Sequence, residues 1–239
     1  MWRHPELWAV LVSGGAWFFL IGTGAFTGGA LHAYTGFAGH MHGLGVHTAW
    51  YVGLARIWPA LALWAFMIAA MMFPPLIRQL RVVAARSLWP RRNRAMALFL
   101  LGYSALWLLY GFAAEACLRL QRNLWPAATF LIPLCFLTAA LWQLTPQKRR
   151  SLVACHHTIP LAPSGWRADF DCWRYGLRTA ANCCVSCWAL MFACAAAGHA
   201  LWSLLVVTGI SWSERFRPRS RQRWFALALF ATALYELKK

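Results

Sequence analysis

The sequence predicts an all-α fold, a polytopic bundle of six to seven transmembrane helices with a cytoplasmic N-terminus. Three features support this: long apolar runs, few charged residues, and basic residues gathered in short clusters between the runs. Hydrophobic residues make up 61% of the 239 residues and charged residues only 12%, about half the charged fraction of a typical soluble domain. A mean hydropathy of +0.50 points the same way.

Five apolar segments are each long enough to cross a hydrocarbon core of roughly 30 Å as a helix. Two shorter runs follow, and each is either a short span or a hairpin that dips partway into the bilayer. The first segment has no clear cleavage site after it and is expected to be a retained helix. The five long segments are Leu7–Phe26, Trp58–Ile77, Ala95–Cys117, Trp125–Leu144 and Tyr175–Ala197, and the shorter ones are His199–Ser213 and Trp224–Leu237.

The basic residues predict the orientation. With seven helices starting inside, 18 of the 23 Lys and Arg residues lie in inside segments and five lie outside, as the positive-inside rule requires. Their partner is therefore expected to be the lipid bilayer and not nucleic acid. Residues 1–239 form a single membrane domain, with a glycine- and histidine-rich outer loop at 27–57 and a cytoplasmic loop at 145–174.

Several enzyme chemistries lack their motifs. The chain has no glycine-rich phosphate loop, no nucleophile elbow and no His-Glu-x-x-His zinc motif. Six acidic residues in all give poor support to a carboxylate-based hydrolase or a proton-coupled carrier. We therefore expect a protein that is not an enzyme.

Sulfur side chains supply the first candidate ligands. Cys183, Cys187, Met191 and Cys194 are spaced by four, four and three residues, which places them on one helical face. Thiolate and thioether donors prefer Cu(I) to hard cations. Cys184 lies beside this stripe as a further candidate. Thiols near the cytoplasmic end of a helix are expected to stay reduced, so disulfides are not predicted.

Met67 and Met71, one turn apart in the second apolar segment, are candidates too. We expect them to face the bundle interior, toward Cys183 and Cys187. Core packing is the alternative reading, since methionine and cysteine also serve as ordinary apolar residues.

Two loops add imidazole donors. The 145–174 loop contains Cys155, His156 and His157, and the outer loop contains His40 and His42 on either side of a methionine. These histidines are either metal ligands or simply solvated. For Cys155 or His156 to join Cys183 and Cys187, the chain after residue 148 must fold back against the fifth long helix, and the prolines and glycine of this loop suit such a return.

The two acids Glu115 and Glu214 lie near predicted helix ends. Each is expected to pair with neighbouring arginines.

The chain resembles a family of predicted metal-binding integral membrane proteins, which includes a copper-delivery partner of a bacterial polyphenol oxidase. The similarity lies in the Met-Met-x-Pro-like stretch Trp64–Pro74, in the run from Lys148 through Cys155 to the Cys-Trp-Ala-Leu-Met segment ending at Met191, and in the pair that begins at Glu214. It covers roughly residues 58–237. The resemblance implies copper handling in the inner membrane of a bacterium.

The sequence departs from the family pattern at several ligand positions. Ser186 stands where a cysteine is usual, and Cys184 is additional. In the preceding loop Ser151 replaces the first of two cysteines, Cys155 keeps the second, and His156 replaces a common arginine. Two thiols are lost while one thiol and imidazole groups are gained, which leaves either mixed Cys/His ligation or a site without metal.

The leading hypothesis is a copper-handling membrane protein, a Cu(I) acceptor, chaperone or transporter that supplies a cuproenzyme. The alternative is a non-catalytic accessory subunit of a larger membrane complex. The 16 tryptophans, many near predicted helix ends, would suit interface anchoring in either case.

Overall fold

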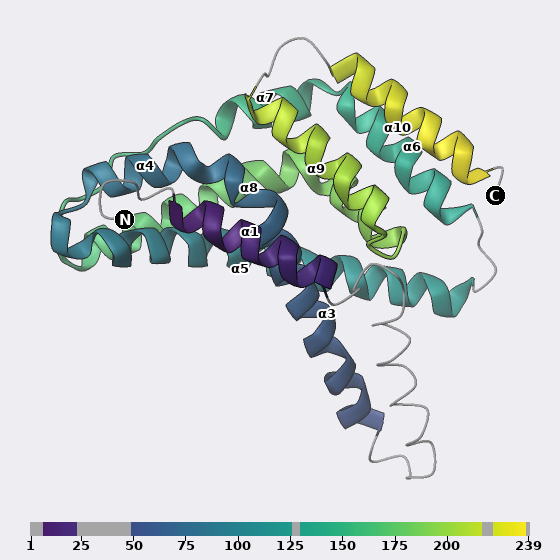
Figure 1. The fold of residues 1–239 in the computed structure, drawn as a ribbon, viewed down its shortest axis with the longest axis horizontal. Helices are drawn as coiled ribbons and strands as arrows, with labels where there is room; N and C mark the ends of the chain where they lie inside the picture. Colours follow the sequence, from purple (N-terminus) through teal and green to yellow (C-terminus); the bar gives the residue numbers. More distant parts are fainter. Residues whose placement is uncertain (1–6, 23–48, 126–129, 217–221, 238–239) are drawn as a thin grey trace.

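The computed structural model describes residues 7–22, 49–125, 130–216 and 222–237, and within these ranges the chain is helical without strands (Figure 1). The all-α prediction is confirmed at this level. The α-helices are α1 (Leu7–Gly22), α3 (Ala49–Met72), α4 (Ile77–Arg86), α5 (Arg92–Leu124), α6 (Leu131–Gln143), α7 (Pro146–Ala154), α8 (Gly165–Ala196), α9 (Leu201–Phe216) and α10 (Gln222–Leu237), with 3₁₀ turns at Pro74–Leu76 and Trp89–Arg91.

The long helices α5 and α8 form the centre of the bundle and pack closely along their length. Glycines permit this approach. A Cβ atom on Gly176 would lie 2.2 Å from the carbonyl oxygen of Phe99, and one on Gly102 would lie 2.5 Å from that of Trp173. Small residues at a helix interface let two backbones come together in this way. The pair therefore forms a fixed frame for the residues that face α3 and α9.

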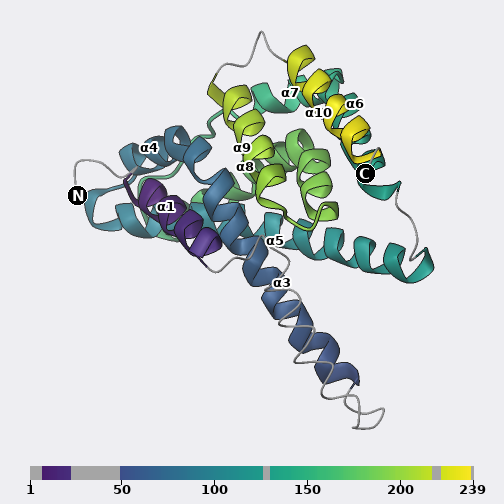
Figure 2. The ribbon, with the colours of Figure 1, turned by 45° about the vertical axis from the view of Figure 1, so that its right-hand side comes forward.

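Helices α3 and α4 pack on α5, while α6, α7 and α9 pack on α8. Helix α1 lies along α3, and α10 lies along α6; after a 45° turn α10 still lies beside α6, and the start of α3 still projects from the bundle (Figure 2). The chain bends by 53° between Leu61–Met72 and Pro74–Arg86. Pro74 accounts for the bend, because proline lacks the backbone donor that a continuous helix needs.

Two described helices, α5 and α8, are long and apolar enough to cross a membrane, and the bent α3–α4 pair would make a third span. Helices α1 and α6 are apolar but shorter. At 1.5 Å per residue, the 13 residues of α6 reach about 20 Å, less than a hydrocarbon core. Six to seven spans are thus more than the described helices show.

Both predicted loops are partly helical. Helix α3 begins at Ala49, inside the expected outer loop. The expected cytoplasmic loop contains α7 and the start of α8. Thr145 caps α7 by accepting a hydrogen bond from the backbone N–H of Lys148 at 3.3 Å, with Pro146 in the first turn. Hydropathy misses this short helix because its sequence is polar, although the Thr-Pro pair is a usual helix start.

Polar contacts anchor the segment between α7 and α8. The Arg86 side chain donates to the carbonyl oxygen of Ile159 at 2.9 Å, and Asp171 accepts from the backbone N–H of Ala162 at 3.1 Å. Two arginines ahead of this segment in sequence, Arg91 and Arg94, both pair with Asp169 at the start of α8. The end of α7 is thereby held near the central pair.

Candidate metal centre

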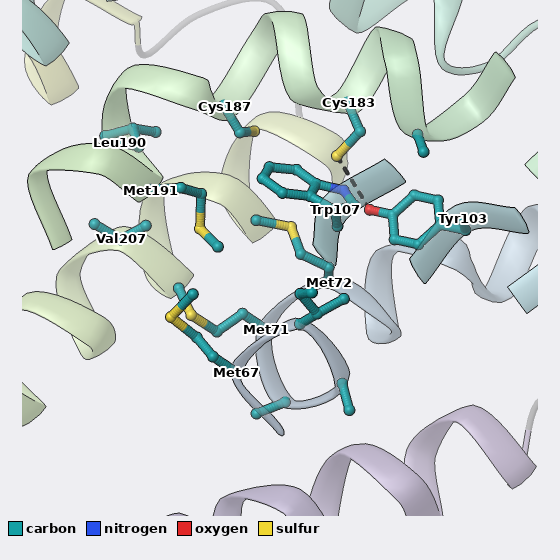
Figure 3. Packing of buried hydrophobic residues seen from close by; sticks show 14 of the residues in the cluster. Met67, Met71, Met72, Tyr103, Trp107, Cys183, Cys187, Leu190, Met191 and Val207 are labelled. Atoms are coloured by element: carbon teal, nitrogen blue, oxygen red, sulfur yellow. Dashed lines mark hydrogen bonds between the residues drawn. The ribbon is translucent and has the colours of Figure 1, made fainter. Parts of the chain in front are cut away.

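A row of sulfur atoms lines the interior between α3 and α8 (Figure 3). Every side chain in the row is at most 2% exposed. The prediction that Met67 and Met71 lie in the bundle interior is confirmed by their burial, and Figure 3 shows them together with Met72 and the α8 residues Cys183, Cys187 and Met191. Cys194, equally buried, lies three residues beyond Met191 on α8 and therefore on the same face. We call these seven residues the sulfur row: Met67, Met71 and Met72 on α3, and Cys183, Cys187, Met191 and Cys194 on α8.

Cys183 and Cys187 lie at one end of this row. The Sγ atom of Cys183 accepts a hydrogen bond from the hydroxyl of Tyr103 at 3.2 Å. Ser186 donates to the carbonyl oxygen of Cys183 at 2.9 Å, and its Oγ lies 3.4 Å from the Cys187 sulfur. Both thiols therefore already have polar neighbours, unlike the thioethers further along the row.

Cys155, at the end of α7, lies close enough to Cys187 to interact with it electrostatically. Its side chain is 1% exposed, and its carbonyl oxygen accepts a 2.9 Å hydrogen bond from the Gln79 side chain. Burial raises the pKa of the Cys155 thiol, the Arg215 guanidinium lowers it, and Cys187 raises it. The chain after residue 148 folds back on α8, because α7 packs against that helix, and this meets the condition that a site shared by Cys155, Cys183 and Cys187 requires. Cys155, Cys183 and Cys187 are called the thiol cluster below.

Buried charges accompany the thiol cluster. Arg215 on α9 is 7% exposed and interacts electrostatically with all three thiols of the cluster and with Tyr103. Lys148 and Glu214 form an ion pair at 2.9 Å with side-chain exposures of 0% and 2%. Glu214 was expected to pair with neighbouring arginines. Among the described residues its ion-pair partner is Lys148, which α7 brings to α9, and the neighbouring Arg215 also interacts with it electrostatically. Glu115 pairs with Arg119 at 2.9 Å and with Arg122 at 3.5 Å, as expected.

The other sequence candidates are less enclosed. Cys184 is partly buried, His156 is half-buried and His157 is exposed. Burial lowers the pKa of His156, and Arg215 lowers it further. His40 and His42 lie outside the described residues. All eight cysteines are free thiols.

The three thiols of the cluster interact electrostatically but do not stand at metal-ligand spacing, since no three His, Cys, Asp or Glu side chains in the described part of the chain come together as a ready-made metal site. A three-ligand form therefore requires Cys155 to move toward the other two thiols. The enclosed soft donors are two thiols on adjacent turns, a third thiol from another element, and thioethers. Such a set suits a soft monovalent ion of low coordination number better than Zn²⁺, which takes four ligands.

Sequence reasoning missed Tyr103 and Arg215, and it also missed His199. His199 lies in the turn between α8 and α9 with a left-handed φ of 57°. It is 9% exposed and packs edge-on against Trp64, with ring centroids 5.6 Å apart. Only the fold reveals this position, because a lone histidine after a helix carries no sequence signal.

Residues 61–236 match the model of a family described as PpoB2, copper chaperone. The chain belongs to the PpoB2 copper chaperone family. The matched region contains the sulfur row, the thiol cluster and Arg215, and it leaves out α1, His40 and His42. A copper chaperone carries metal and does not catalyse a reaction, in agreement with the non-enzyme prediction. No curated protein and no solved structure matches the chain.

Proposed function

We propose that this PpoB2-family chain is a Cu(I) chaperone embedded in the bacterial inner membrane, which holds copper at the thiol cluster and passes it to a client cuproenzyme. One observation carries the proposal: the thiols of α8 face the methionines of α3 in a closed interior, within the region that matches a copper chaperone family. Copper here is cargo.

Cys183 and Cys187 are the primary ligands. Residues four apart on a helix have Cβ atoms about 6 Å from each other, which suits two thiolates that share one Cu(I) in a near-linear arrangement. Each thiol gives up its proton when it binds the metal. Cys155 is the third ligand of a trigonal form, and His156, next to it, is an alternative donor.

Arg215 balances the charge of the loaded site. Two thiolates and one Cu(I) carry a net charge of −1, which would be costly to bury alone. The Arg215 guanidinium, buried among these thiols, offsets that charge. Arg215 thus acts through the ligands and needs no bond to the metal.

The methionines of the sulfur row provide the route to the thiol cluster. Thioethers are neutral and bind Cu(I) weakly, so the ion can move from Met67 and Met71 by exchange of one sulfur for another. At the cluster the stronger thiolates retain it. In this proposal the outer histidines His40 and His42 collect the metal first.

The membrane location rests on α5, α8 and the bent α3–α4 pair, together with the one-sided distribution of basic residues. The proposal keeps six to seven spans with 78–94, 145–174 and 214–223 in the cytoplasm. Labelling of a Ser87→Cys variant that lacks the native cysteines tests this orientation. Reaction with an impermeant thiol reagent from the outer side would contradict it.

Metal analysis of the full chain, purified in mild detergent under reducing conditions and loaded with Cu(I), tests the function. The wild type should hold about one copper ion tightly, and Cys183→Ser/Cys187→Ser should hold little. The matched control is Cys117→Ser/Cys135→Ser, which removes two thiols outside the sulfur row and should keep the copper.

Two results would contradict the proposal. Full copper content in Cys183→Ser/Cys187→Ser would place the site elsewhere. A wild-type protein that binds no Cu(I) would favour the accessory-subunit alternative.

A further inference from the structure

Both helices that carry the sulfur row, α3 and α8, contact His199, which is not itself part of the row. On α3, Trp64 lies three residues before Met67 and therefore on the same face. On α8, the backbone N–H of His199 donates to the carbonyl oxygen of Cys194 at 3.0 Å, just past the last sulfur of the stripe. His199 and Trp64 are in contact. The imidazole of His199 thus lies at the end of the sulfur row near Trp64 and Cys194. The thiol cluster and Arg215 lie at the opposite end.

The imidazole of His199 has a nitrogen available for a ligand. Its Nε2 atom is buried and has no hydrogen-bond partner within the described residues. A buried polar atom without a partner costs free energy, so such a position needs an explanation. The left-handed backbone at this residue, with φ of 57°, is a second unfavourable feature that the fold nevertheless retains.

The surroundings favour a cation of soft character. Trp64 presents an aromatic ring to the imidazole. Glu115, which is already paired with Arg119 and Arg122, is the one carboxylate that interacts electrostatically with His199 in the described part of the chain. Neutral imidazole is a ligand for Cu ions as well as for Zn²⁺. The nearest donors of the sulfur row are the Met67 thioether on α3 and the Cys194 thiol and Met191 thioether on α8. These soft donors bind hard cations poorly, so they would exclude them from the route.

We propose that His199 is the take-up ligand of the sulfur row, at which Nε2 binds incoming Cu(I) before transfer to the methionines. This rests on the proposed copper function and adds a residue and a direction to it. Copper enters at the His199 end and is retained at the thiol cluster. Loss of His199 therefore slows loading and leaves the amount bound at saturation unchanged.

A matched pair of substitutions tests this role. His199→Met and His199→Leu place residues of similar size in the same left-handed backbone, so both carry similar strain, but only the methionine offers a donor. His157→Leu, at the exposed histidine beyond α7, is the control. Each full-length protein in detergent is mixed with a Cu(I)–bicinchoninate complex, and the absorbance of the complex reports the rate of copper transfer.

We expect His199→Leu to load about tenfold more slowly than the wild type, the lower end of effects seen when the support of a metal site is damaged. His199→Met and His157→Leu should load within about twofold of the wild type. All four proteins should reach the same copper content, and the melting temperatures of the two His199 variants should agree.

Two results would overturn the inference while leaving the proposed function intact. One is wild-type loading by His199→Leu. The other is equally slow loading by His199→Met and His199→Leu, which would assign the residue a structural role. A wild-type protein that takes no Cu(I) would instead overturn the proposed function, and this inference with it.

Discussion

The two ends of the sulfur row differ in chemistry. At the thiol cluster, Cys183 and Cys187 lie among buried charges: the Arg215 guanidinium and the Lys148–Glu214 ion pair. At the His199 end the neighbours are the Trp64 ring and Cys194, whose sulfur lies 3.5 Å from the Ser203 hydroxyl. The same interior thus joins a charged end to a nearly neutral one.

The difference indicates which end can retain a metal. Thiolates are strong ligands for Cu(I) but carry negative charge, which must be balanced when it is buried. Only the thiol cluster has that balance. The His199 end offers a neutral ligand, so it can bind and release without a change of buried charge.

Loss of the Glu214 charge should have the largest effect. Glu214→Gln leaves the Lys148 ammonium buried without its partner, which typically costs about 3–5 kcal/mol. Because this pair ties α7 to α9, the thiol cluster should also lose Cys155. Denaturant or thermal unfolding in detergent measures the stability.

The double variant Lys148→Met/Glu214→Gln is the control, since it removes both charges and keeps comparable volumes. It should recover most of the lost stability. If Glu214→Gln alone is as stable as the wild type, the pair does not hold α7 in place.

A substitution at the His199 end of the sulfur row should lower the free energy of unfolding by less than Glu214→Gln does. A Cβ atom on Gly111 would lie 2.7 Å from the Trp64 ring, so Gly111→Ala must displace the ring on which His199 packs. Overpacking of this kind costs about 1–3 kcal/mol, and copper uptake should slow while copper content is unchanged. Gly209→Ala on α9, where no atom lies within 4 Å of the added methyl, is the control. Equal stability of the two variants would argue against tight packing at Trp64.

Arg215→Met should weaken copper retention without abolishing it. The methionine keeps much of the volume but removes the positive charge, and we expect about a tenfold loss of Cu(I) affinity, measured by competition with a Cu(I) chelator. Arg215→Lys keeps the charge and should lie between Arg215→Met and the wild type. An Arg215→Met variant with wild-type affinity would show that the thiolates need no counter-charge.

The smallest effect should be a pH dependence that comes from Cys155. Burial raises the pKa of this thiol, so it is protonated near neutrality and must lose a proton to bind copper. The affinity gap between the wild type and Cys155→Ser should therefore widen as the pH rises from about 6 to about 8. A gap that is constant with pH would mean that Cys155 is not a ligand.

Much of the fold could be predicted from local sequence. Long apolar runs located α5 and α8, and the spacing of Cys183, Cys187 and Met191 placed them on one buried face, because helix periodicity is a local property. Helix α7 was missed since it is polar and short. The number of membrane spans could not be predicted from apolar runs either. The run that contains α6 was long enough for a span, but the helix it forms has only 13 residues, fewer than the roughly 20 that a span needs.

The long-range part of the site could not be predicted. Tyr103 and His199 carry no motif, and Arg215 was noticed only as the second residue of the Glu214-Arg215 pair and not as a residue of the site. Each becomes relevant only through contacts with helices far away in sequence. Local spacing suggested neighbouring arginines for Glu214, and Arg215 does interact with it, but the Lys148 ion pair from α7 could not be predicted because it depends on the fold.

X-ray absorption at the copper edge of the Cu(I)-loaded protein tests copper retention at the thiol cluster. We expect a first shell of two or three sulfur atoms in the wild type, and loss of this sulfur signal in Cys183→Ser/Cys187→Ser. A first shell made mainly of nitrogen or oxygen that persists in that variant would contradict copper retention at the thiol cluster.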